Sequence, residues 1–467
     1  MAQQLYFSRD SVMTLEIGDK PTSKVWKIPV LEGFSFSQAT NVSEITLNEM
    51  EAGDGTSRRG RRAFNDSLAP VEFSFSTYAR PFKASGSGSA DSAAHHHAVE
   101  EALWALFSGP ATYDNTGKDF GVQTVHDATD MNVSFELSNA AVLGPTGANP
   151  GANLYFEFGD TAATKVTYKL GKIVLNEASI DFDIDGVATI NWTGFADTVT
   201  QFSTTRIVDG AVISDATVNI TTTDTSDLSL GMRVTGTGIT GTAVYIDSIT
   251  DNNTIELSAA QSLGDAAVLH FGPPEPDITE AILATNNFIR NRLTKVFVVP
   301  TTQDPDGDST NELEDEYVLT LTGGNITLSN NVTYLTPEEL GVVNVPIGHV
   351  TGTRSYGGSM TCYLTEQTTG ANATKASKDF FDDLKGISNI VSNSFKLVFL
   401  IGGGTDIDSL TSPGLRVEMA TCHVDIPTHS VEDIVQLETT FSALPSTIDA
   451  KDEVALIYKG DTPNVVS

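Results

Sequence analysis

Short segments in which apolar and polar residues alternate recur along the whole chain, with turn-forming residues between them. Residues 74–78 (SFSTY) and residues 359–363 (SMTCY) follow nearly the same pattern. An alternation of period two places the apolar side chains on one face, so each segment predicts a half-buried β-strand. The pattern predicts a mainly β fold and raises the question of why one chain carries nearly the same strand twice.

The similarity between the two parts of the chain extends beyond this strand. Gly33 matches Gly323 and Thr46 matches Thr336 at one constant offset, and the two quoted strands follow at a slightly smaller offset. Each match is weak by itself. Their shared order indicates an internal duplication, which determines how the rest of the chain is interpreted.

A helix is predicted once in each half. Each quoted strand is followed by a polar stretch and then by a segment with apolar residues at positions i, i+4 and i+7, within 97–109 and within 377–388. This spacing is typical of an amphipathic helix that packs on a core. The apolar positions are Val99, Leu103 and Leu106 in the first half, and Phe380, Leu384 and Ile387 in the second.

Further strands follow each helix in the same order. Residues 134–137 match 394–397, and residues 172–184 match 422–434. A last pair of strands sets Trp192 opposite Phe441. The repeated order predicts two copies of one β-rich domain with a single flanking helix.

The predicted architecture is therefore two tandem β-sandwich or barrel-like domains, 1–206 and 273–467, each with one helix. Residues 207–272 lie between them and have no counterpart in either copy. This segment is rich in Thr, Gly and Asp, and a turn is expected at residues 251–253. It predicts a small inserted β-module on the surface.

Length and composition agree with this architecture. A chain of 467 residues is expected to hold two to four domains, and its 39 glycines and 18 prolines suit short strands joined by turns. Cys362 and Cys422 have no CxxC partner, so we expect two small buried hydrophobic residues. No stretch has the length and apolarity of a membrane span, and the N-terminus lacks the pattern of a cleaved signal peptide.

The formal net charge of −33 bears on possible partners. A nucleic-acid-binding protein normally presents a basic face, because neutralising phosphates supplies most of its affinity. A chain this acidic is expected to meet DNA only as a surface that repels it. It is equally compatible with a soluble acidic protein that meets no nucleic acid.

Three segments resemble sites of chemistry, but none predicts a catalytic, cofactor or metal site. Residues 304–316 alternate acids as a calcium loop does, but Gly307 is the fourth residue rather than the sixth, so a solvated hairpin tip is favoured. The run of histidines at 95–97 lacks the ligand spacing of a zinc site and is interpreted as a polar lead-in to the helix. The glycines within 401–406 favour a hairpin turn over a phosphate loop.

Four arginines in an acidic chain form the feature most in need of a partner. The segment from Glu44 to Pro70 is too long and polar for a simple hairpin, and long loops of this kind are functional or disordered. One interpretation is a solvated, mobile loop, another is an arm that docks on an acidic neighbouring subunit, and DNA contact is a third. The arginines are Arg58, Arg59, Arg61 and Arg62.

Residues 61–82 (RRAFNDSLAPVEFSFSTYARPF) together with residues 321–364 (LTGGNITLSNNVTYLTPEELGVVNVPIGHVTGTRSYGGSMTCYL) resemble the major tail tube proteins of long-tailed bacteriophages. The chain is most similar to the branch of flexible-tailed siphophages whose tube protein carries two fused tube domains. The resemblance covers about 1–206 and 273–460 and leaves the insert outside.

This resemblance implies a structural virion protein of the phage tail, assembled in the host cytoplasm. Each tube domain is then expected to join its neighbours in a β-barrel around a lumen, with stacked rings through which genomic DNA passes without specific binding. A duplicated chain is expected to form homotrimers with pseudo-hexameric symmetry. The expected partners are further copies of the chain, the tape measure protein and the tail terminator and tip proteins, with no membrane, and the arm of Glu44–Pro70 would reach a neighbouring subunit or ring.

Other classes of protein remain open from the residues. A β-sandwich surface adhesin or a capsid decoration protein explains the acidity and the Thr/Gly richness, although not the ordered duplication. A glycan hydrolase would need a pair of carboxylates about 5–10 Å apart, and no segment of the sequence points to one. We therefore expect no enzyme.

Overall fold

The computed structural model describes most of the chain, in segments. The described residues are 5–18, 24–46, 61–84, 95–109, 120, 124–135, 151–159, 165–221, 224–241, 243–276, 287–300, 317–337, 344–366, 376–386, 395–405, 407–431, 433–448 and 450–461. The predicted calcium-like segment 304–316, Ile387 of the predicted second helix, and Arg58 and Arg59 lie outside them.

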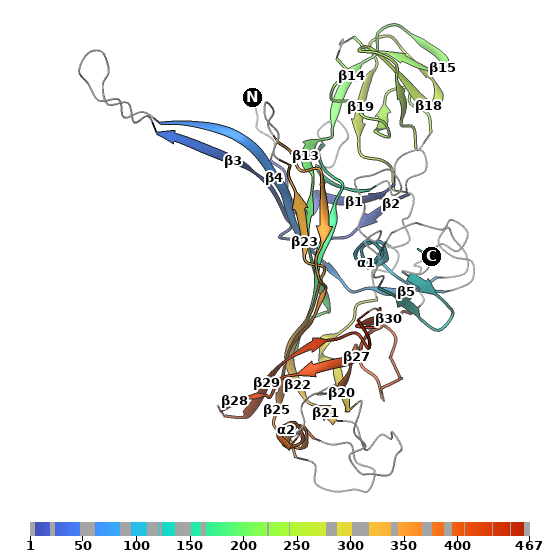
Figure 1. The fold of residues 1–467 in the computed structure, drawn as a ribbon. Coiled ribbons are helices and arrows are strands. Elements are labelled where there is room, and N and C mark those ends of the chain that lie inside the picture. The colour runs from blue at the N-terminus through green and yellow to red at the C-terminus, as the bar shows by residue number, and fades with distance from the viewer. Residues whose placement is uncertain are drawn as a thin grey trace, which may run out of the picture.

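A sheet of eight consecutive antiparallel strands runs down the molecule and contains strands from both halves (Figure 1). Its order is β3-β4-β12-β11-β22-β25-β29-β28. The first half supplies β3 (Ser35–Thr46), β4 (Arg61–Tyr78), β12 (Thr189–Ala196) and β11 (Val174–Asp183). The second half supplies β22 (Leu321–Ser329), β25 (Ser355–Tyr363), β29 (Val435–Ala443) and β28 (Thr428–Val431).

Alternation in the sequence accounts for these strands. Every second residue of β12 is buried, with Ile190 and Trp192 fully inaccessible, and β4 buries Phe73 and Phe75 in the same way. One face of the sheet therefore packs on a core while the other carries the polar residues. The mainly β fold predicted from the sequence is confirmed.

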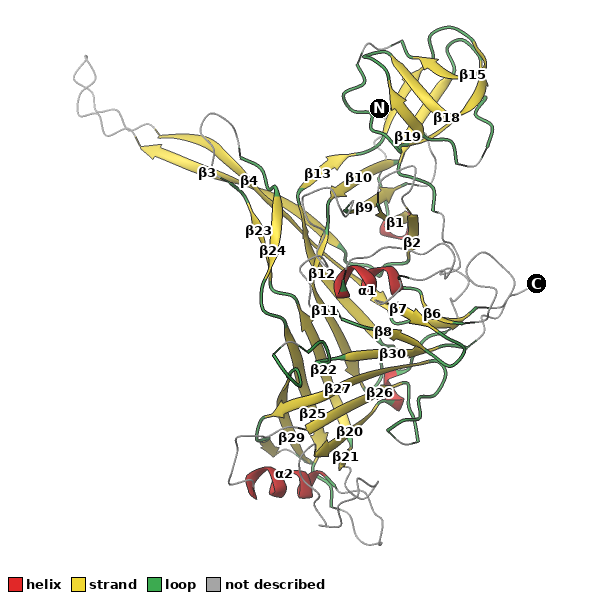
Figure 2. Cartoon of the chain, turned by 45° about the vertical axis from the view of Figure 1, so that its right-hand side comes forward, coloured by secondary structure: helices red, strands yellow, loops and turns green. Residues whose placement is uncertain are grey.

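Two further layers cover the apolar face of this sheet. In the first half the layer is β2 (Lys24–Ile28), β1 (Ser11–Ile17), β9 (Ala152–Phe158), β10 (Val166–Gly171) and β13 (Thr198–Gln201). In the second half it is β21 (Tyr317–Leu319), β20 (Lys295–Pro300), β26 (Phe395–Ile401), β27 (Gly414–Val424), β30 (Ala455–Lys459), β8 (Met131–Val133) and β7 (Thr124–His126). Figure 2 shows α1, β27 and β30 on the same side of the large sheet.

Strand pairing repeats in the two halves and corrects three of the sequence matches. The match of 172–184 with 422–434 is shifted by one residue, because Ser179 lies opposite Asn191 as Thr428 lies opposite Glu438. β9 lies between β1 and β10 as β26 lies between β20 and β27, so β9 corresponds to β26, and the match of 134–137 with 394–397 is wrong. Trp192 lies opposite Phe75, whose counterpart Met360 lies opposite Thr439. The match of Trp192 with Phe441 is therefore shifted by two residues, which alternation alone cannot detect because the face stays the same.

Both predicted helices are present, with different surroundings. α1 (Glu101–Ser108) begins after Val99, and all eight of its residues are buried rather than one face only. Its Trp104 packs edge-on against Trp192 with 4.7 Å between ring centroids and donates a hydrogen bond to the Tyr458 hydroxyl at 2.7 Å. α2 (Ser377–Gly386) buries Phe380 and Leu384 as predicted.

The segment predicted as an insert forms two three-stranded sheets with a core of their own (Figure 1). Residues 251–253 connect the antiparallel strands β17 and β18, which confirms the predicted turn. The strands are β14 (Thr204–Ile207), β19 (Val268–Gly272) and β16 (Arg233–Gly236) in one sheet, and β15 (Val212–Asn219), β18 (Thr254–Leu263) and β17 (Ile246–Ile249) in the other.

Gly402 and Gly403 begin the connection between antiparallel β26 and β27, as the glycine-rich segment predicts.

The remaining described elements are two pairs of short strands and two 3-10 turns. The strand pairs are β5 (Pro81–Lys83) with β6 (His96–Ala98) and β23 (Val332–Leu335) with β24 (Gly348–Thr351), and the turns are η1 (Ser8–Asp10) and η4 (Asn291–Leu293).

The histidine run is not the polar lead-in that its sequence suggests. His96 and His97 are each only 3% exposed, and the His97 ring stacks on Phe82. Glu101 lies against His97 and His126. Burial alone would raise the pKa of Glu101, but the two imidazoles outweigh it and lower the pKa to about 2.

Both cysteines are free and buried, as predicted. Burial raises the pKa of Cys362 to about 11 and that of Cys422 to about 12, so neither is a reactive thiolate at neutral pH. No helix among the described residues is long and apolar enough to cross a membrane.

One aromatic–glycine contact occurs in both halves, with the two strands exchanged. In the first half Phe73 of β4 lies opposite Gly194 of β12, whereas in the second Gly358 of β25 lies opposite Phe441 of β29. A Cβ at Gly194 would be 2.5 Å from Phe73 Cζ, and one at Gly358 would be 2.9 Å from Phe441 Cζ. Glycine therefore makes room for the aromatic ring to lie across the neighbouring strand.

We expect Gly194→Ala and Gly358→Ala each to lower the free energy of unfolding by about 1–3 kcal/mol, because the added methyl overlaps both a ring and a backbone carbonyl. Urea unfolding of the purified chain measures this. Gly264→Ala is the matched control, since no atom lies within 4 Å of its added Cβ, and it should stay within about 0.5 kcal/mol of the parent. Equal stability of all three variants would contradict the packing argument.

Candidate assembly surface

The two halves share one sheet through the pairing of β11 with β22. The ladder runs from Glu177 opposite Ser329 to Asp183 opposite Gly323. Ile180 and Ile326 face each other within it and are fully buried. The backbone hydrogen bonds and the core are thus continuous from the first half to the second.

The eight-stranded sheet has two edges among the described residues. β3 pairs only with β4, and β28 pairs only with β29. All four residues of β28 are exposed, and β3 exposes Ser35 and Ser37. Such edges present backbone N–H and C=O groups that a further strand can pair with.

The solvent-facing side of the sheet is polar and acidic. Its strands contain no lysine, and their two arginines both lie at the start of β4. Ser76 donates to the Asn191 side chain at 2.6 Å, which shows how the polar residues link neighbouring strands. Apart from Glu44 and Asp66 in the projecting part of the β3–β4 pair, the carboxylates of the eight strands are Glu72, Glu177, Asp181, Asp183 and Glu438.

At residues 44–46 and 61–70, where the structure describes it, the arginine-bearing segment consists of paired strands rather than the irregular loop predicted between Glu44 and Pro70, and residues 47–60 lie outside the described residues. β3 and β4 stay paired as far as Thr46 and Arg61, and they project from the rest of the molecule (Figure 1). Arg61 forms an ion pair with Glu44 at 3.0 Å and stays 73% exposed, and Arg62 follows it in β4. Polar strands pair here because side chains such as Asn41, which donates to Ser67 at 2.8 Å, link the two strands.

The hairpin β23–β24 is the counterpart of this arm in the second half, because Val42–Ile45 correspond to Val332–Leu335 at the offset found in the sequence. It contacts the first half of the same chain. Val332 N donates to the Asn176 side chain at 2.7 Å, and the Tyr334 hydroxyl donates to Lys172 O at 2.7 Å. Burial and the nearby Asp197 carboxylate raise the pKa of Tyr334, which keeps the hydroxyl protonated.

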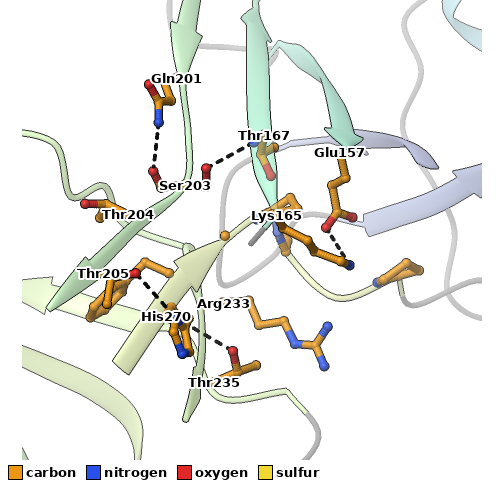
Figure 3. A pocket seen from close by; sticks show the side chains of 15 residues that line it. Glu157, Lys165, Thr167, Gln201, Ser203, Thr204, Thr205, Arg233, Thr235 and His270 are labelled. Atoms are coloured by element: carbon orange, nitrogen blue, oxygen red, sulfur yellow. Dashed lines mark hydrogen bonds and ion pairs between the residues drawn. The ribbon is translucent and has the colours of Figure 1, made fainter. Parts of the chain in front are cut away.

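A cavity of about 160 Å³ lies where the insert meets the first half (Figure 3). Glu157 is the single carboxylate among its described lining residues, and it forms an ion pair with Lys165 at 3.0 Å. His270 lies 3.2 Å from the Thr205 hydroxyl. This lining does not supply the pair of carboxylates that a glycan hydrolase needs.

Sequence reasoning identified the arm but missed the edges of the sheet. The arginines that the structure describes, Arg61 and Arg62, are on adjacent positions of one strand, so their side chains point to opposite faces. The β11–β22 junction has no local signal, because it pairs residues about 150 positions apart. The alternation of apolar and polar residues, together with the duplication, was the sequence information from which this pairing of β11 with β22 could have been inferred.

No known family model matches this chain. The chain is similar to the tail tube protein pb6 of Escherichia phage T5, with 28% identity over 459 residues, covering 97% of this chain and 74% of that protein. This similarity confirms the resemblance to phage major tail tube proteins that the sequence predicts.

Proposed function

We propose that the chain is a major tail tube protein, a structural component of the virion tail that self-assembles into the tube through which phage DNA passes. The similarity to a tail tube protein over nearly the whole chain carries this proposal. The eight-stranded sheet with two open edges supports it, because further copies can pair with those edges. We propose no enzymatic role, and a surface adhesin is not favoured.

Three chains form each ring in this proposal. Each chain supplies two sectors of four strands, so three chains of eight strands would close a barrel and leave no edge unpaired. The domain division is 1–206 and 273–467 for the two tube domains, with 207–272 as the insert. A core cluster of its own supports the insert as a separate unit, whereas the two tube domains share one core and are divided by the duplication in the sequence.

The lumen is lined by the acidic side of the sheet. The opposite face is covered by the back layers, and the core of the insert includes Tyr155 of β9, which belongs to one of these layers, and the adjacent Phe202. An insert on this side lies outside the tube and leaves the lumen free for DNA. The tape measure protein and the terminator and tip proteins are the other proposed partners.

The arm of the first half reaches a neighbouring subunit. Its counterpart β23–β24 already lies against the adjacent sector within the chain, so the same geometry would bring Arg61 and Arg62 onto the next chain. A partner with the same net charge of −33 offers abundant carboxylates. Arg58 and Arg59, which lie outside the described residues, belong to the same arm.

End-on negative-stain electron microscopy of the purified chain tests the proposal. We expect rings or tubes with a central hole, a sixfold outline and a mass of three chains per ring. Replacing the four arm arginines by alanine should abolish or strongly reduce these assemblies while the chain stays folded, because the arm loses its charged contacts.

The control for this experiment is Arg290→Ala with Arg292→Ala, which removes exposed cations away from the arm. Filaments without a lumen, or single rods from the parent chain, would overturn the tube and favour the adhesin. Normal tubes from the four-arginine variant would leave the tube standing and remove the role of the arm.

The duplication also gives a register for the contact between chains. Asn325 lies opposite Ser359 as Ser35 lies opposite Ser74, so β22 corresponds to β3. By the same reasoning Thr428, opposite Glu438, corresponds to Ser179, opposite Asn191. Within the chain Ser179 lies opposite Thr327, whose counterpart in β3 is Ser37. We therefore expect Thr428 of one chain to lie opposite Ser37 of the next.

A chain carrying Ser37→Cys and Thr428→Cys should form disulfide-linked dimers and trimers in assembled tubes under oxidising conditions, as seen on a non-reducing gel. A link within one chain is excluded, because seven strand spacings of about 4.8 Å separate the two positions and a disulfide spans at most about 7 Å. The native cysteines are buried and do not compete. Each single-cysteine chain is the control, and tubes without cross-links would refute this register.

Lumen charge is tested by neutralising Glu72, Asp181 and Glu438, which are all exposed. Virions with Glu72→Gln, Asp181→Asn and Glu438→Gln should eject DNA more slowly. A wall with fewer carboxylates repels the DNA phosphates less, so the DNA can come closer to the wall and interact with it as it passes. Single-virion ejection kinetics measures this. The same number of neutralised acids on the insert, at Asp209, Asp247 and Glu256, should change nothing, and unaltered ejection from the lumen variant would argue against a repelling wall.

A further inference from the structure

Three buried ionisable side chains meet behind the large sheet of the first half. They are His97 of β6, Glu101 at the start of α1 and His126 of β7, and one nitrogen or oxygen of each lies within 4.8 Å of the other two. Their side chains are 3%, 9% and 1% exposed, in that order. Charges this deeply buried are costly unless a partner compensates them.

The distances in this cluster fit a metal site. His97 Nδ1 lies 3.1 Å from Glu101 Oε2, and His126 Nε2 lies 3.4 Å from the same oxygen. Ligand atoms around a tetrahedral zinc ion with bonds of about 2.0–2.1 Å are about 3.3 Å apart. The carboxylate oxygen therefore lies at ligand spacing from both imidazole nitrogens.

His126 supplies a second observation. Both of its ring nitrogens are buried, and neither makes a hydrogen bond to any residue that the structure describes. Its Nε2 faces Glu101 without hydrogen-bond geometry. Buried polar atoms normally have a partner, and a coordinated cation would supply one at this nitrogen.

We propose that His97, Glu101 and His126 form a binding site for a divalent transition-metal ion, and that Zn²⁺ is the ion that fits best. Two imidazole nitrogens and one carboxylate oxygen are a ligand set that zinc uses, with a water molecule in the fourth position. Ca²⁺ and Mg²⁺ prefer shells made entirely of oxygen and are not expected to bind here.

The site would strengthen the joint between the two halves. β7 pairs with β8, and β8 pairs with β30 from the C-terminal end of the chain. On the other side, Gly460 N donates to His96 Nδ1 at 3.0 Å, next to the proposed ligand His97. An ion that fixes β6 and α1 to β7 therefore holds the segment on which β30 docks. This proposal does not depend on tube assembly.

The test uses the full chain, stripped with a chelator and then desalted. We expect about one equivalent of Zn²⁺ to be retained per chain and Co²⁺ to give the visible absorption of a tetrahedral site, which Zn²⁺ then displaces. Zn²⁺ should raise the midpoint of thermal unfolding, since it binds the folded state, whereas Mg²⁺ and Ca²⁺ should not. This last comparison requires no variant, so it holds even where a substitution impairs folding.

His126→Gln and Glu101→Gln should each lower the affinity for Co²⁺ more than about 100-fold, because the loss of an outer-shell group already costs about 10–100-fold. His423→Gln is the matched control, because His423 also lies beside a carboxylate, Asp425 at 3.5 Å, but both are exposed. Failure of the parent chain to retain zinc, or an unchanged affinity in folded His126→Gln, would overturn the proposal. The three residues would then be a metal-free histidine–carboxylate cluster.

Discussion

The open edge of a β-sheet is the constraint on which this structure depends. The backbone N–H and C=O groups along the edge strands β3 and β28 need hydrogen-bond partners. Inside the chain the corresponding edges of the two halves are already paired, because β11 of the first half pairs with β22 of the second. Ile180 and Ile326 show that this internal junction is also a continuous core rather than a contact of backbones alone. An assembly that repeats the junction between chains satisfies both needs with geometry that the chain already contains.

Alternation and duplication made much of this fold predictable from the sequence. The mainly β architecture, both helices and the turn in the insert followed from local sequence patterns, and the constant offset between matches such as Thr46 and Thr336 indicated the duplication. The matches between strands of the two halves were wrong where the apolar–polar alternation does not determine which residues lie opposite each other. A shift of two residues left Trp192 on its face and was invisible until Phe75 showed which residue it pairs with.

Contacts between distant segments were out of reach of the sequence for a physical reason. His97 and Glu101 are four residues apart, which is a recognisable helical spacing, but His126 joins them only through the fold of β7. A histidine run in a polar stretch resembles a solvated lead-in until burial is known. The arm was misjudged in a related way, because Asn41 and Ser67 stabilise a polar ladder that hydrophobic patterning does not detect.

Duplication in one chain also permits differences that a ring of identical single domains cannot have. The first half carries the arginines of the arm and is followed by the insert, whereas the second half has a hairpin without lysine or arginine in β23 or β24. The exchange of Phe73–Gly194 for Gly358–Phe441 shows that even a shared packing contact has changed strands. Because the sheet fixes only backbone pairing, each half is free to change its side chains and loops as long as the β11–β22 geometry is preserved.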